Sequence, residues 1–152
     1  ATLNDRYLRL AADFDNFKKR IQRESEHRAA AQKDAFVRDW LPVLDNLERS
    51  VASATGHFPE QLRQGVQMIW QQALQILKQH SFEPQEDLGQ PFNPDRHEAV
   101  AIRGDTAYPD HAVLDVWQRG WRRGTSLFRP AKVVVNDLKT RSGSAALPNS
   151  EP

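Results

Sequence analysis

A regular pattern of apolar residues opens the chain. Between Leu3 and Ile21 large apolar side chains recur at alternating spacings of four and three residues, as on one face of a helix that pairs with another helix. No glycine or proline occurs before Pro42, so the pattern predicts a single helix from Leu3 to about Asp39. The apolar positions of this face are Leu3, Tyr7, Leu10, Phe14, Phe17 and Ile21.

The expected length of this helix has a consequence for its surroundings. A helix of about 37 residues spans roughly 55 Å, whereas a compact globule of this chain's 152 residues measures about 40 Å across. The helix must therefore extend beyond its own core, and its apolar face needs a second helix to cover it. We predict a parallel homodimer paired along residues 1–40. The alternative is a hairpin within the chain, in which residues 60–81 fold back along the long helix.

Two shorter helices are predicted to follow, because Pro42 marks a break in the helical pattern. The first covers residues 41–51, and the second begins at Pro59 and continues through residue 80. In two copies of the chain this segment, residues 41–81, would form a four-helix bundle. The core of the bundle is predicted to contain Leu44, Leu47, Leu62, Val66, Ile69 and Leu77.

The pattern changes after residue 81 from helical to strand-like, with clusters of glycine, proline and asparagine that indicate turns. Three strands are predicted, over residues 97–103, 112–121 and 126–135. The last contains Pro130, which suits an edge position or a bulge. We therefore expect an α+β fold in which residues 82–137 form a small sheet module and residues 138–152 a flexible tail.

Composition and charge narrow the classes of protein. The chain has no cysteine, which excludes disulfide scaffolds, thiolate zinc sites and cysteine nucleophiles. No apolar run is long enough to span a bilayer, so we expect a soluble protein with no membrane partner. The net charge is only +1, but it is unevenly distributed. Residues 41–105 carry five basic and nine acidic groups, and residues 112–141 carry seven basic and two acidic groups, which predicts an acidic helical part and a basic sheet.

Motifs for catalysis are not found in the sequence. The pair His97 and Glu98 resembles the start of a zinc-protease motif, but Ala101 stands where the second histidine is required. We therefore predict no metal, no cofactor and no enzymatic activity. Residues 117–123 interleave tryptophan and arginine, as a platform for single-stranded nucleic acid would. Packing of the tryptophans on neighbouring strands, with arginines on a protein-binding surface, is the preferred interpretation of this segment.

Four ordered segments resemble the GrpE family, the nucleotide exchange factors of DnaK-type chaperones. They are residues 12–20, 41–49 and 89–100, and the combination of Gly120 and Trp121 with residues 129–135. Together they cover roughly residues 10–137 in the order and spacing of the family. The resemblance implies a homodimer with long paired helices, a four-helix bundle and two β-sheet wings. It also implies that one wing docks on the nucleotide-binding domain of the chaperone and holds its cleft open, so that ADP leaves and ATP enters.

The resemblance implies a bacterial cytosolic protein, with an organelle matrix as the other possibility. Two other functions stay open at this point: a coiled-coil dimeric scaffold, and a protein that binds single-stranded nucleic acid through the Trp/Arg-rich strand. Against the pattern of the family, Ser126 replaces an arginine of the wing, and Arg122 and Arg123 are the candidates to take over its contact.

Candidate chaperone contacts follow from the resemblance. In the wing and in the loop that leads into it they are Arg129, Pro130, Lys132, Val133, Phe92, Pro94 and His97, and in the long helix they are Lys18, Lys19 and Arg20. The alternatives are sheet core for the phenylalanine, proline and valine residues, and a solvated surface for the basic ones. Gly65 joins this set because glycine inside a helix costs about 1 kcal/mol relative to alanine. We expect it to allow close approach of another backbone, from the bundle or from the chaperone.

Overall fold

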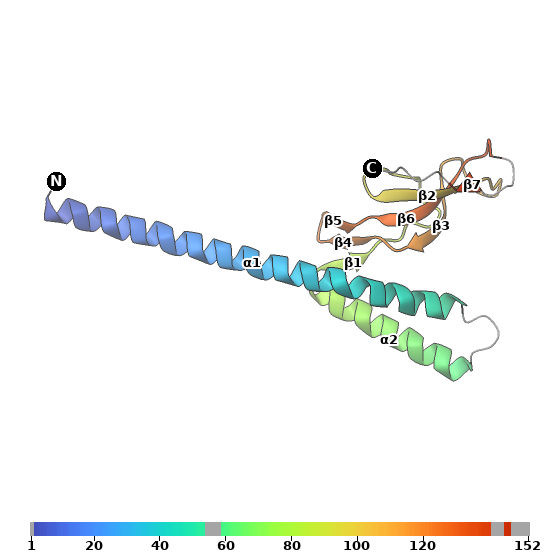
Figure 1. Cartoon of the computed structure of the whole chain (residues 1–152), viewed down its shortest axis with the longest axis horizontal. Coiled ribbons are helices and arrows are strands. Elements are labelled where there is room, and N and C mark those ends of the chain that lie inside the picture. Colours follow the sequence, from blue (N-terminus) through green and yellow to red (C-terminus); the bar gives the residue numbers. More distant parts are fainter. Residues whose placement is uncertain (1, 54–58, 141–144, 147–152) are drawn as a thin grey trace. The chain divides into compact units, whose positions relative to one another are not determined.

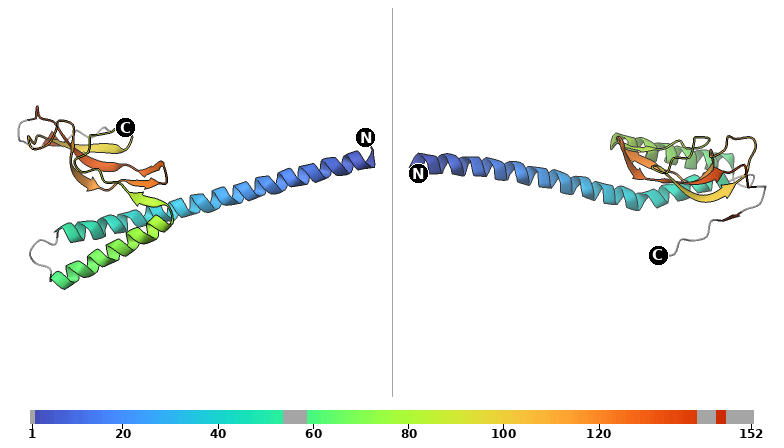
Figure 2. Two further views of the ribbon diagram at one scale, coloured as in Figure 1. Left: turned by 180° about the vertical axis from the view of Figure 1, so that it is seen from behind. Right: turned by 90° about the horizontal axis from the view of Figure 1, so that it is seen from above.

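The computed structural model describes residues 2–53, 59–140 and 145–146, the last two by their backbone alone. The chain divides into two compact units, Ala1–Leu44 and Asp45–Pro152, which are described separately below. Helix α1 (Leu3–Ser53) passes from the first unit into the second, and helix α2 (Glu60–Gln79) belongs to the second. Figure 2 shows each of them as one unbroken helix.

Helix α1 begins with a reciprocal cap. The backbone N–H of Thr2 donates to the Asp5 carboxylate (2.9 Å), and the backbone N–H of Asp5 donates to the Thr2 hydroxyl oxygen (3.3 Å). These two bonds satisfy donors that a helix start otherwise leaves free. Hydrogen bonding of the Asp5 carboxylate by the Thr2 side chain and by the Thr2 backbone N–H holds the pKa of Asp5 below its ordinary value.

The predicted break at Pro42 is wrong, because α1 continues through this residue to Ser53. A proline inside a helix loses one backbone hydrogen bond and costs about 3 kcal/mol. The side chains of Val37, Leu41 and Leu44 are buried at spacings of four and three residues on both sides of the proline. Burial of this continuous apolar face offsets the cost, so the long helix and the first short helix of the prediction form one element.

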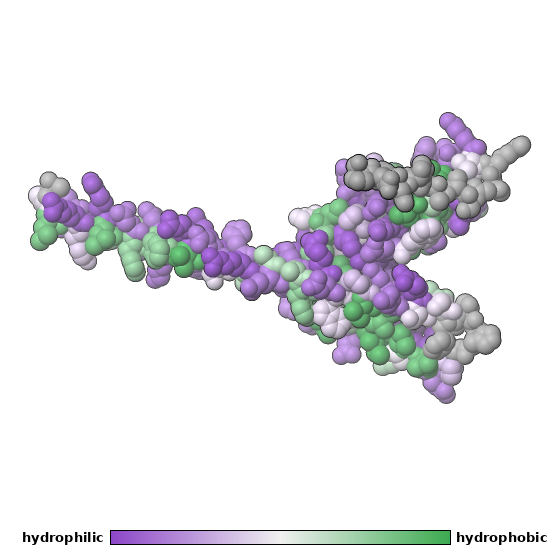
Figure 3. All heavy atoms as spheres, viewed as in Figure 1, coloured by the Kyte–Doolittle hydropathy of each residue, from purple (hydrophilic) through white to green (hydrophobic). Residues whose placement is uncertain are grey.

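The N-terminal part of α1 exposes its apolar face. The six predicted residues of this face lie between 86% exposed, for Leu3, and 46% exposed, for Ile21. Figure 3 shows hydrophobic residues gathered along one side of this part of the helix. Within the first unit they therefore form an uncovered apolar stripe.

Helix α2 confirms the predicted span and is amphipathic. It follows Pro59, which occupies the position before the first helical residue. None of its residues is fully buried. Its half-buried side chains include Val66, Trp70, Ala73, Leu74 and Leu77, and its exposed large apolar ones are Leu62, Met68, Ile69 and Ile76.

The strands form two small sheets (Figure 1). They are β1 (Phe82–Pro84), β2 (His97–Arg103), β3 (Val113–Gln118), β4 (Trp121–Arg123), β5 (Ser126–Arg129), β6 (Ala131–Asn136) and β7 (Ala145–Ala146). The three-stranded sheet is antiparallel throughout, with the order β1-β4-β5. The four-stranded sheet has the order β3-β6-β2-β7, in which β2 and β6 are parallel and the other pairs antiparallel.

The predicted strand over residues 97–103 is confirmed as β2. The other two predicted strands are each divided between the two sheets. Of the predicted strand over residues 112–121, the part up to Gln118 forms β3, and Trp121 already begins β4. The backbone between the two strands is closely packed at Gly120. A Cβ atom at Gly120 would lie 2.5 Å from Gln85 Oε1 and 2.9 Å from the Ala131 nitrogen, so only glycine fits here.

Pro130 divides the third predicted strand into β5 and β6, because it has no N–H for a ladder. The short strands β1 and β7 are not in the prediction. Strand β7 lies within the segment expected to be a flexible tail, and it pairs with Ala101 and Ile102 of β2. The rest of that expected tail after residue 140 lies outside the described residues.

The core of the four-stranded sheet is formed by Val113, Ala131, Val133 and Val135, against which Phe92, Ala99 and Val116 pack. In the other sheet Phe82 and Trp121 are buried, and the Phe82 and Phe128 rings meet edge to face with centroids 4.9 Å apart. The buried Asn136 side chain accepts a bond from the Asp105 N–H and donates to the carbonyl oxygens of three residues of the preceding loop, Asp105, Tyr108 and Pro109.

Candidate functional site

The predicted contact residue Arg129 is engaged inside the second unit. Its guanidinium binds both carboxylate oxygens of Asp45 in α1, with Nη1–Oδ2 and Nη2–Oδ1 distances of 2.8 Å. The same guanidinium donates from Nε (3.2 Å) and Nη2 (2.6 Å) to the backbone carbonyl oxygen of Arg119. The Arg129 side chain is 15% exposed and that of Asp45 is 13% exposed. Arg129 is therefore not on a solvated edge, which was the alternative left open for it.

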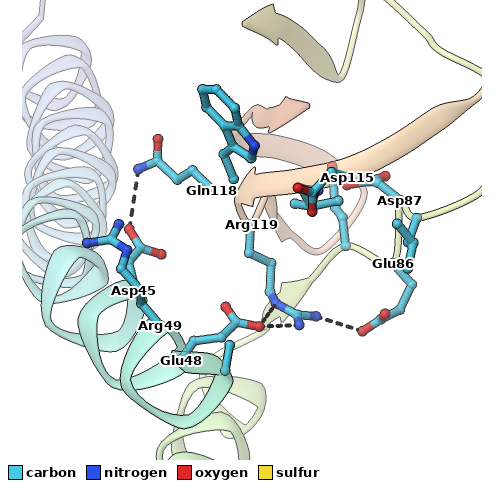
Figure 4. A pocket seen from close by; sticks show the side chains of 13 residues that line it. Asp45, Glu48, Arg49, Glu86, Asp87, Asp115, Gln118 and Arg119 are labelled. Carbon is cyan, nitrogen blue, oxygen red and sulfur yellow. Dashed lines mark hydrogen bonds and ion pairs between the residues drawn. The ribbon is translucent and has the colours of Figure 1, made fainter. Parts of the chain in front are cut away.

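Arg119, between β3 and β4, makes a second connection to α1. Its Nε donates to Glu48 Oε1 (2.9 Å), its Nη2 donates to the same oxygen, and its Nη1 donates to Glu86 Oε1 (2.8 Å), as Figure 4 shows. The guanidinium carbon lies 6.0 Å from the centre of the Trp70 ring of α2. Burial alone would lower the pKa of Arg119, but the Glu48 and Glu86 carboxylates outweigh it and raise the pKa above its ordinary value. The guanidinium is therefore held in its charged form.

The two arginine sites form one cluster. Asp45 and Glu48 lie three residues apart on α1 and share a face of the helix. Gln118 adds a bond from its side-chain amide to Asp45 Oδ2 (3.3 Å). All of the cluster except Arg129 borders a hollow of about 350 Å³, whose lining also includes the exposed side chains of Leu88 and Trp117. Sequence reasoning missed the pairing, although the acidic helical segment and the basic sheet segment gave a signal for it.

The candidate His97 belongs to a buried network. Its Nδ1 accepts a hydrogen bond from the Asn93 N–H (2.9 Å), so the ring hydrogen is assigned to Nε2, which donates to Asp87 Oδ1 (2.9 Å). Arg96 Nη2 donates to the same carboxylate oxygen. The Phe92 and His97 ring centroids are 5.8 Å apart, and Phe92 packs on the sheet core. His97 and Phe92 thus shape the loop from inside.

The other wing candidates divide into exposed and buried residues. Val133 is fully buried in the sheet core, which agrees with the alternative stated for it. Pro94, Pro130 and Lys132 are exposed. Arg122 is exposed and forms an ion pair with Glu83 (3.3 Å). The Arg123 guanidinium lies over the Phe82 ring, 5.9 Å from its centre.

The basic candidates on α1 are at the surface. Lys18, Lys19 and Arg20 are all exposed, and the Arg20 guanidinium lies 5.6 Å from the centre of the Phe17 ring. At Gly65 in α2 an added Cβ atom would meet no described atom within 4 Å. The described part of the chain therefore does not provide the close backbone approach that was expected at this glycine.

The predicted bundle residues do not all face outward. Leu62 and Ile69 are exposed, and Leu47, Val66 and Leu77 are half-buried. Leu44 is only 3% exposed in the single chain. Its place in the core of a dimeric bundle stays a prediction.

The Trp/Arg-rich segment does not form a platform for bases. Trp117 is 60% exposed, but Trp121 is 1% exposed and packed in the sheet. Arg119, between them, is occupied by two carboxylates. Stacking on successive bases requires several exposed aromatic faces with free cations beside them, and this segment presents one exposed ring.

The described residues contain neither a cluster of metal ligands nor a membrane-spanning helix. No group of three or more histidine, aspartate or glutamate side chains in residues 2–53 and 59–140 is placed to hold a metal ion. Neither described helix is both long and apolar enough to cross a membrane.

Comparison with known proteins places the chain in a family. Residues 1–137 match the GrpE family model. The chain is 37% identical to Protein GrpE of Parageobacillus thermoglucosidasius over 88% of its length and 38% identical to that of Carboxydothermus hydrogenoformans over 86%. It is 36% identical to Protein GrpE of Pseudomonas putida over 98% of its length and 80% of the relative's. It spans 60% of the Parageobacillus protein and 66% of the Carboxydothermus protein. The match across residues 1–137 shows that the chain belongs to the GrpE family.

Proposed function

We propose that this chain is a nucleotide exchange factor that binds the nucleotide-binding domain of a DnaK-type chaperone in the bacterial cytosol. It holds the cleft of that domain open and so promotes the release of ADP. The observation that carries the proposal is the match of residues 1–137 to the GrpE family. The order of a long helix, a second helix and a small β-sheet module supports it.

The proposed unit is a homodimer. The exposed apolar stripe of α1 between Leu3 and Ile21 supports this, because a stripe of this size in water is unfavourable unless another surface covers it. The exposed Leu62 and Ile69 of α2 give the same argument for a bundle of four helices. The open space around Gly65 is available for the backbone of the second chain or of the chaperone.

The proposed contact surface uses the exposed members of the candidate set. In the sheet module these are Pro94, Arg122, Pro130 and Lys132, and on α1 they are Lys18, Lys19 and Arg20. Arg129, His97, Phe92 and Val133 support this surface from inside through the bonds and packing described above.

The mechanism needs no catalytic side chain, because exchange is a case of coupled binding. A factor that prefers the open cleft weakens ADP binding by the same factor by which ADP weakens binding of the factor. A difference of about 4 kcal/mol between the two states would shift the ratio of open to closed clefts roughly a thousandfold.

The test is the release of fluorescently labelled ADP from the DnaK-type chaperone of the source organism. Substoichiometric amounts of the chain should accelerate release, and Lys132→Glu should weaken the effect because it reverses an exposed charge on β6. Lys139→Glu is the matched control, since it makes the same change at another exposed site of the module. A coiled-coil scaffold would dimerise but leave ADP release unchanged at saturating concentration, and that result would overturn the proposal.

A further inference from the structure

The sheet module is joined to the helices at two places within the second unit. One is covalent: β1 begins at Phe82, directly after α2 ends at Gln79. The other consists of two arginines that bind α1. Arg119 binds Glu48, 71 residues away in the sequence, and Arg129 binds Asp45, 84 residues away. A module held only by one short connection can swing about it, whereas a second attachment fixes its direction.

The second attachment has a geometry that fixes angles as well as distances. The Arg129 guanidinium and the Asp45 carboxylate form two parallel hydrogen bonds, so their planes are aligned. The remaining donors of Arg129 hold the backbone carbonyl of Arg119, whose own side chain binds Glu48. The two contacts are thus interlocked, and loss of the first would loosen the second.

The attachment is also shielded from water. The side chains of Arg129 and Asp45 are 15% and 13% exposed, against 24% and 33% for those of Arg119 and Glu48. Salt screens such pairs less than exposed ones. Removal of one partner leaves the other as a nearly buried charge without compensation, which is unfavourable. Substitution of one partner is therefore expected to disfavour the clamped arrangement.

We propose that Asp45, Glu48, Arg119 and Arg129 form a clamp that positions the sheet module on the end of α1, and that this clamp sets the strength of coupling between chaperone binding and ADP release. The second half of the proposal rests on the proposed function. These four residues are positioning residues, and the exposed surface of Lys132 and Pro130 makes the contact.

The physical reason is the transmission of force. A module that holds a cleft open must resist the tendency of the cleft to close, and it can do so only if it does not turn on its support. When the clamp is broken, the contact surface is unchanged, but the module follows the cleft as it closes. The factor then distinguishes less between the open, nucleotide-free chaperone and the closed, ADP-bound one.

The first experiment measures the position of the module without any chaperone. Because the chain has no cysteine, the substitutions Ser50→Cys on α1 and Thr125→Cys in the β4–β5 turn create the only two sites for thiol-reactive spin labels. Labelled chain is mixed with an excess of unlabelled chain, so that distances between protomers do not contribute. The distance between the two labels should have a single narrow distribution in the chain that carries only the labelling substitutions. The distribution should be clearly broader when Asp45→Asn is added. An unchanged distribution would overturn the clamp.

The matched control is Asp115→Asn, which makes the same chemical change in a carboxylate that lines the same hollow but is exposed and bonds the Val116 N–H. It should leave the distribution narrow. Glu48→Gln is the second variant, because it loosens Arg119 and keeps the Asp45 pair. Circular dichroism of every variant shows whether the helices remain folded.

The second experiment measures coupling as the ratio of dissociation constants for ADP-bound and nucleotide-free chaperone. Asp45→Asn should reduce this ratio about fivefold or more, within the range of coupling factors between sites, while Asp115→Asn keeps it. A broadened distance distribution with an unchanged ratio would overturn the link to exchange. If the unsubstituted chain failed to accelerate release of ADP from the chaperone, the proposed function would be refuted. The distance measurement would still show whether the clamp exists.

Discussion

The N-terminal part of α1 and the four-stranded sheet both have regular apolar patterns, but they bury them differently. The apolar stripe of α1 between Leu3 and Ile21 remains exposed in the chain, whereas Val113 and Val133 of the sheet are fully buried. The sheet covers its apolar residues with its own strands and with Phe92. The same kind of pattern therefore belongs to a self-sufficient core in one region and to an apolar surface that the chain leaves exposed in the other.

The largest expected effect comes from Phe14→Ala, which tests the exposed region. If the stripe is an interface, the substitution removes a buried ring from each of two chains. At about 1.5–3 kcal/mol for each ring, the dissociation constant of the dimer should rise at least about 100-fold in sedimentation equilibrium. Asp15→Ala, off the stripe, is the control and should leave it nearly unchanged. Equal effects of the two substitutions would contradict the interface.

Trp121→Ala tests whether the three-stranded sheet of the same module also depends on a core of its own. Truncation of a fully buried tryptophan typically costs about 3–5 kcal/mol, and here it should appear as faster hydrogen exchange of the β4 and β5 amides. The matched control is Trp117→Ala, since this ring on β3 is mostly exposed and its loss should cost no more than about 0.5 kcal/mol. The opposite ranking would show that the sheet does not depend on its own core.

Gly65→Ala is expected to have the smallest effect, and its sign sharpens the comparison. Nothing described lies within 4 Å of the new methyl group, so the substitution should stabilise α2 by up to about 1 kcal/mol in the separate chain. Thermal unfolding at low concentration measures this gain. If another backbone lies against Gly65 in the complex, the same substitution should weaken dimerisation or chaperone binding. A gain in stability with no loss of either association would remove Gly65 from the interfaces.

Local patterns predict most of the elements here. The helical spans and β2 follow from periodicity, because side chains three or four apart, or two apart, share a face. The break at Pro42 is wrong because the burial of Leu41 and Leu44 is a tertiary effect that outweighs the local cost of proline. At Pro130 the local rule is right, and the two strands that it separates belong to different sheets.

Local patterns of this kind cannot predict the clamp. Asp45 and Arg129 lie 84 residues apart, and their types alone do not show which acid meets which base. Only the uneven distribution of charge indicated that the helical part and the sheet complement one another. The same limit applies to the candidate contact residues. Their types suit contacts with a partner, but whether each is buried depends on the fold: Arg129 and His97 face inward, whereas Lys132 faces outward.

The parallel pairing of β2 with β6 has a consequence for the order of folding. It joins residues such as His97 and Ala131, more than thirty positions apart, and the two strands cannot pair until the chain between them has closed into a loop. The helices need only neighbours three and four residues away, which form much faster than distant pairings. During synthesis helix α1 therefore presents an uncovered apolar face before the sheet has formed. In the proposed homodimer, association of two nascent chains can then precede completion of either one.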